Sequence, residues 1–140
     1  MAITAGIGAA PAIAWAVGDQ SEGGAADDRA LQPLKIPTFT WWLLGIGSLI
    51  ALGLAFLRVF STVRSDACSV VWLVALGAFA TVGGGVGLGY RIATARVTGA
   101  NIGYGIFVIF VGPMLIVTLL FAIGALVRAW QLQRRPPFSN

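Results

Sequence analysis

The chain has 140 residues, of which 58% are hydrophobic and 10% are charged. Soluble domains carry about a quarter charged residues, so this composition excludes an ordinary water-soluble globule. The net charge of +4 comes from nine Lys and Arg against five Asp and Glu. The basic residues stand singly or in pairs at the ends of apolar runs, without a basic stripe of interleaved aromatics. They therefore indicate membrane borders and exclude a nucleic-acid partner.

Residues 1–18 form an uncharged segment rich in Ala and Gly, with Pro11 inside it. A secretory signal peptide needs a positively charged start, which this segment lacks. Two alternatives stay open. The segment is a short transmembrane helix kinked at Pro11, which makes a fourth span, or a helix lying at the interface or against a partner. We expect an ordered, membrane-associated segment.

Residues 19–38 form the longest polar stretch, an acidic and Gly-rich loop that holds four of the five acidic residues. Pro33 and Pro37 give it an extended approach to the next helix. Five basic residues share the side of the carboxyl terminus, and four share the side of this loop. The positive-inside rule then places the carboxyl terminus inside and the loop outside.

Residues 39–131 are predicted to form a transmembrane helical bundle whose first span covers about residues 39–57. Trp41 and Trp42 open this span as interface anchors, because indoles prefer the headgroup region. Small residues recur every four positions within it and predict a face for close helix packing. They are Gly47, Ala51 and Ala55.

The second predicted span covers residues 68–90 and follows a short link, which makes the two spans antiparallel neighbours. Its small residues also recur every four positions and predict a second packing face. They are Gly77, Thr81, Gly85 and Gly89. The run Gly83–Gly89 lacks the Lys-Ser/Thr of a phosphate-binding loop and follows no strand. It predicts close helix packing, or a pocket where a lipid or flat cofactor meets bare backbone.

The third predicted span covers residues 102–127, inside a longer run without charged residues. That run exceeds the roughly 20 residues needed to cross a bilayer. Pro113 predicts a kink, because proline removes a backbone hydrogen bond and clashes with the preceding turn. Three further interface anchors follow, and residues 132–140 form a polar, Pro-rich tail. The anchors are Trp130, Arg134 and Arg135.

Absent residue types restrict the chemistry. The chain has no His, and no acidic residue lies in a predicted span. This excludes His-based metal and nucleophile sites and disfavours proton-coupled transport. Cys68 is the only cysteine, so no intrachain disulfide forms. The few polar residues of the spans are expected to bond to their own helices. They are Ser48, Thr81, Tyr104 and Thr118.

The sequence therefore predicts an all-α integral membrane protein with three transmembrane helices and an additional N-terminal membrane-associated segment. We expect no catalytic or metal site and no cofactor held by its own residues, although contact with a lipid, quinone or pigment stays open. The hypothesis for function is an accessory subunit that packs against other membrane subunits and lipids. The complex is expected to be respiratory or photosynthetic, in a bacterial inner membrane or an organelle. The alternative is a small homo-oligomeric channel or transporter.

Overall fold

The computed structural model describes residues 2–18, 29–63 and 68–133, and every regular element within these ranges is helical. The elements are α1 (Ala2–Ala16), α2 (Thr38–Val63), α3 (Cys68–Thr94), α4 (Ala100–Ile106), the π-helical turn η1 (Phe107–Val111) and α5 (Gly112–Gln133). Three stretches are long and apolar enough to cross a membrane. They are Thr38–Ser61, Val70–Thr94 and Ala100–Leu132. The prediction of an all-α membrane protein with three spans is confirmed.

The helices extend beyond the predicted spans. α2 continues past Leu57 and Arg58 to Val63, and α3 continues past Tyr90 and Arg91. Arginine is a good helix former, and its long side chain reaches the headgroups from inside a helix. A charged residue therefore marks the depth of the membrane border and does not mark the end of the helix.

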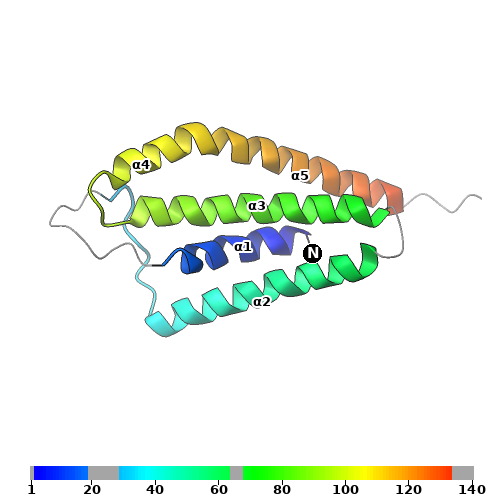
Figure 1. The fold of residues 1–140 in the computed structure, drawn as a ribbon, viewed down its shortest axis with the longest axis horizontal. Coiled ribbons are helices and arrows are strands. Elements are labelled where there is room, and N and C mark those ends of the chain that lie inside the picture. The colour runs from blue at the N-terminus through cyan, green and yellow to red at the C-terminus, as the bar shows by residue number, and fades with distance from the viewer. Residues whose placement is uncertain (1, 19–28, 64–67, 134–140) are drawn as a thin grey trace, which may run out of the picture.

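The N-terminal helix α1 lies between α2 and α3 (Figure 1). It runs parallel to α3 and antiparallel to α2, and it continues through Pro11. At a rise of 1.5 Å per residue its 15 residues span about 22 Å, which is shorter than the roughly 30 Å of hydrocarbon in a bilayer. The sequence left open a short span and a helix at the interface or against a partner, and neither alternative anticipated that α1 packs against two helices of its own chain.

Alanine dominates the interior of the bundle. The core cluster consists of Ala2, Ala5, Ala55, Val59, Ala75, Leu76, Phe79 and Ala122. Among the described residues, Leu76 is the one large side chain that is completely buried. Lipid tails are as apolar as leucine, so burial of large apolar side chains gives little drive for helix association in a membrane. Small side chains instead allow the backbones to approach closely and to gain van der Waals contact.

A π-helical turn lies directly before Pro113. In this turn the N–H of Gly112 donates to the carbonyl oxygen of Phe107, five residues earlier. Pro113 has no N–H for the carbonyl of Ile109, so the regular ladder is interrupted here. Figure 1 shows α4, η1 and α5 as one continuous helix that bows away from α3. The sequence placed the irregularity at Pro113, and the structure places the π turn at residues 107–111.

Candidate packing faces and grooves

Among the described helices, α1 and α3 approach each other backbone to backbone. A Cβ atom at Gly83 would collide with the carbonyl oxygen of Gly6, and one at Gly87 would collide with the carbonyl oxygen of Ala10. The neighbours at both places are backbone atoms, which cannot turn away as a side chain can. These two glycines lie within the predicted run Gly83–Gly89 but outside the predicted four-residue ladder. Their own spacing of four residues was the signal that sequence reasoning missed.

The predicted ladder on α3 divides into two parts. Gly85 and Gly89 lie against the third span, where a Cβ would stand 2.5 Å from Leu115 and 2.6 Å from Phe107. Gly77 has open space where its Cβ would stand, and Thr81 is exposed. The ladder winds around α3 because four residues make slightly more than one turn. Gly85 and Gly89 therefore face the third span, whereas Gly77 and Thr81 lie on an open side of α3.

The predicted ladder on α2 winds in the same way. Ala55 is buried, and the methyl of Ala51 lies 3.9 Å from where a Cβ at Gly8 would stand. Gly47, however, has open space and contacts no neighbouring helix at that point. Each step of four residues turns about 40° around the helix, so Gly47 and Ala55 stand about 80° apart. The face against α1 instead includes Ser48, whose carbonyl oxygen lies 3.2 Å from the Cβ position of Gly8.

The indole of Trp15 lies in a slot left by a glycine on α2. A Cβ at Gly45 would stand 2.5 Å from Cγ of Trp15. The ring also meets Trp42 edge to face, with the centroids 5.2 Å apart and the planes at 74°. Trp42 is half exposed, and Trp41 on the next position is partly buried. Trp42 thus contacts the end of α1 while about half of its surface remains exposed, and its role as an interface anchor stays a prediction.

Trp130 is the remaining predicted anchor that the structure describes, and it lies at the opposite end of the bundle. Trp130 is half exposed near the end of α5. Arg134 and Arg135 lie outside the described residues, as do residues 19–28 of the acidic loop and most of the Pro-rich tail. At the end where Trp15 and Trp42 lie, the segment before α2 is held to α3 through backbone N–H groups. Leu31 donates to the carbonyl of Ala93 at 2.9 Å, and Leu34 donates to the Tyr90 hydroxyl at 3.1 Å.

Three polar side chains inside the spans bond to their own helices. Ser48 donates to the carbonyl of Gly45 at 2.9 Å, Thr81 to that of Gly77 at 2.9 Å, and Thr118 to that of Met114 at 2.7 Å. The prediction of local hydrogen bonding is confirmed for these residues. Their donors are occupied, which leaves mainly apolar surface between the helices. Within the described ranges, no three metal-ligating side chains lie together.

A large apolar groove crosses the middle of the bundle, with a volume of about 680 Å³. We call it the central groove. Its α3 side includes Gly77, Thr81 and Gly84, and residues of α1, α2, η1 and α5 complete it. The remaining lining residues are Ala9, Ile13, Leu52, Phe56, Ala80, Gly85, Leu88, Val111 and Leu115. Part of the predicted glycine run therefore leaves bare backbone at a groove surface.

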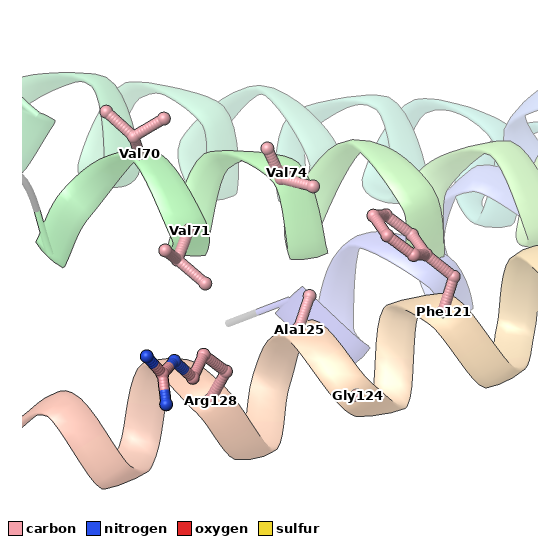
Figure 2. A pocket seen from close by; sticks show the side chains of 7 residues that line it. All are labelled: Val70, Val71, Val74, Phe121, Gly124, Ala125 and Arg128. Carbon is pink, nitrogen blue, oxygen red and sulfur yellow. The ribbon is translucent and has the colours of Figure 1, made fainter.

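A second groove of about 380 Å³ lies between the start of α3 and the end of α5, and we call it the α3–α5 groove. It is lined by Val70, Val71, Val74, Phe121, Gly124, Ala125 and Arg128. In Figure 2 the valines stand on α3 and the other four residues on α5. Phe121 lies towards one end of the groove and Arg128 towards the other. The sequence marked Arg128 as the end of a span and Phe121 as part of a surface suited to lipid or another subunit, but it did not bring the two together in one groove.

Comparison of the chain with protein-family models, with curated proteins and with solved structures finds no match. The two grooves and the packing faces are therefore the features of the molecule that bear on its function.

Proposed function

We propose that the protein is an accessory membrane subunit that packs against and stabilises a larger membrane complex. The observation that carries the proposal is the central groove, and its occupant is a transmembrane helix of another subunit. The proposed groove contact lies along α3 from Gly77 to Leu88, which is about 16 Å, or three helical turns. That length suits a contact between two helices.

The unoccupied space beside Gly77 supports a transmembrane helix as the occupant of the central groove. Gly77 meets no atom within 4 Å of its Cβ position, and Thr81 beside it is exposed. A glycine inside a helix destabilises it by roughly 0.5–1 kcal/mol relative to alanine, so its presence at an open position needs another reason. Interfaces between transmembrane helices are rich in Gly, Ala, Ser and Thr because small residues let backbones approach. Gly77 and Thr81 provide such a surface.

The alternative of a homo-oligomeric channel needs the glycine-rich part of α3 to line a central axis. In this fold Gly83 and Gly87 are covered by α1, and Gly85 and Gly89 face Leu115 and Phe107. A channel lined by these four glycines would need α1 and α5 to move away first, because the part of α3 that is open at the central groove carries Gly77, Thr81 and Gly84. The accessory role requires no such rearrangement, and for this reason we prefer it.

We further propose that the complex is a respiratory or photosynthetic electron-transport assembly of a bacterial inner membrane or an organelle. The chain has no His, and its five acidic residues all lie outside the three apolar stretches. We therefore assign the chemistry of the complex to its other subunits. A quinone or a pigment bound at the boundary with those subunits would be held by them and would meet only apolar surface on this chain.

The first experiment extracts the tagged protein from its native membrane in mild detergent, and native electrophoresis with mass spectrometry identifies what co-migrates. We expect fixed amounts of other membrane subunits. Thr81→Leu and Gly77→Leu fill the central groove and should release these subunits. Val86→Phe is the matched control, because it adds bulk on an exposed position about half a turn away on α3. A lone species, or a symmetric assembly of this chain alone, would contradict the proposal.

A further inference from the structure

The α3–α5 groove lies at one border of the membrane. Arg91 and Val71 are 20 positions apart on α3, which corresponds to about 30 Å and matches the hydrocarbon thickness of a bilayer. With Arg91 at one border, Val71 therefore reaches the other. Figure 2 shows Arg128 on α5 across the groove from Val71. Its guanidinium accordingly stands at the depth where acyl chains end and headgroups begin.

The lining of the groove suits a hydrocarbon chain. The α3 side consists of three valines, and Gly124 and Ala125 on α5 leave the space between the helices open. A Cβ at Gly124 would meet no atom within 4 Å. The volume of about 380 Å³ lies in the range of roughly 300–1,000 Å³ found for ligand pockets. From Arg128 to Phe121 the groove follows α5 for two turns towards the membrane interior.

The one charged group of the groove is complementary to a phosphate. Arg128 is exposed, and arginine presents parallel N–H donors that match two phosphate oxygens. An apolar channel that leads away from a single cation at the membrane border fits an amphiphile with an anionic head. Basic pockets between transmembrane helices bind anionic headgroups for the same reason.

We propose that the α3–α5 groove is a binding site for an anionic phospholipid. One acyl chain lies along the three valines and Phe121, and Arg128 donates to the phosphate. This site is separate from the central groove, and it exists whether or not the chain is a subunit of a larger complex. Its test therefore uses the purified full-length chain.

The test is native mass spectrometry of the protein in detergent, titrated with dioleoyl phosphatidylglycerol, with dioleoyl phosphatidylcholine or with inorganic phosphate. We expect phosphatidylglycerol to bind about five-fold more tightly than phosphatidylcholine, because one arginine near an anionic headgroup contributes an affinity difference of about this size. Arg128→Gln should remove this preference. Val74→Phe and Gly124→Leu fill the groove from either side and should weaken the binding of both lipids.

Two controls separate the groove from general surface effects. Arg58→Gln removes an exposed cation on α2 near the same end of the bundle, and Val86→Phe adds the same ring to α3 outside the groove. Both should bind lipid as the unaltered protein does. The proposal fails if Arg58→Gln lowers the preference as much as Arg128→Gln does. It also fails if neither groove-filling variant weakens binding, or if inorganic phosphate competes fully with the lipid.

Discussion

The carbonyl oxygen of Gly6 on α1 occupies the space that a Cβ at Gly83 on α3 would need. This contact joins two backbones, and the next glycine one turn along, Gly87, repeats it against Ala10. Each added atom at these positions must push one helix away from the other, because neither neighbour is a side chain that can rotate. The pair Gly6 and Gly83 therefore sets the distance between α1 and α3.

Gly83→Ala should destabilise the bundle by about 1–3 kcal/mol, the usual effect of inserting atoms into a packed interior. Thermal unfolding in detergent, followed by circular dichroism, measures the loss. Gly77→Ala is the matched control on the same helix, because its Cβ enters open space. That control should be stable to within about 1 kcal/mol of the unaltered chain or slightly more stable. Equal losses for the two variants would show that α1 does not pack at Gly83.

Gly89→Ala should lower the free energy of unfolding less than Gly83→Ala does, although both positions are buried. The atom that a Cβ at Gly89 would approach, at 2.6 Å, is Cε1 of the Phe107 ring. The far end of a side chain can shift, so the strain is spread over the ring and its neighbours. The same unfolding measurement ranks the two variants. If Gly89→Ala proves the more damaging, the side-chain packing of α3 against η1 is tighter than we infer.

Gly45→Ala and Trp15→Ala should show strong energetic coupling. The new methyl of Gly45→Ala would stand 2.5 Å from the indole of Trp15, so the single substitution destabilises by displacing the ring. Once Trp15→Ala has removed the ring, the methyl has room. We expect the double variant to be more stable than the sum of the two losses predicts, by about 1 kcal/mol or more. Additive losses in the double-mutant cycle would place Trp15 outside the slot at Gly45.

Pro113→Ala should make the turn at residues 107–111 more regular. Alanine supplies an N–H that can donate to the carbonyl of Ile109, which favours the α-helical over the π-helical ladder. Amide hydrogen exchange in this turn should then become about ten-fold slower, since its N–H groups gain better-aligned partners. Exchange in α3 should be unchanged and provides the reference within the same sample. Unaltered exchange at residues 107–111 would assign the π turn to a cause other than the proline.

The three spans could be predicted from sequence because long apolar runs can satisfy their backbone polar groups in a bilayer only as helices. The local hydrogen bonds of Ser48, Thr81 and Thr118 were predictable for a related reason, since each carries its acceptor on the preceding turn. These properties depend on residues close together in the chain. They need no knowledge of which helices are neighbours.

The packing partners could not be predicted in the same way. A spacing of four residues identifies rows of small residues on α3, but it does not show which row faces which helix. Two such rows exist on α3, and each packs against a different helix. The ladder with Gly85 and Gly89 faces the third span, while Gly83 and Gly87 face α1. The α3–α5 groove was missed for the same reason. Val74 and Arg128 carry no shared local pattern, and they line the same groove only because α3 and α5 run antiparallel.

The central position of α1 has a consequence for biosynthesis. The ribosome releases α1 before α2 and α3, and the surface that holds α1 is built from both later helices. α1 can therefore reach its final place only after α3 has been made. Until then the glycine face of α3 is uncovered, and the half-assembled chain presents to chaperones and proteases a surface that the finished protein hides.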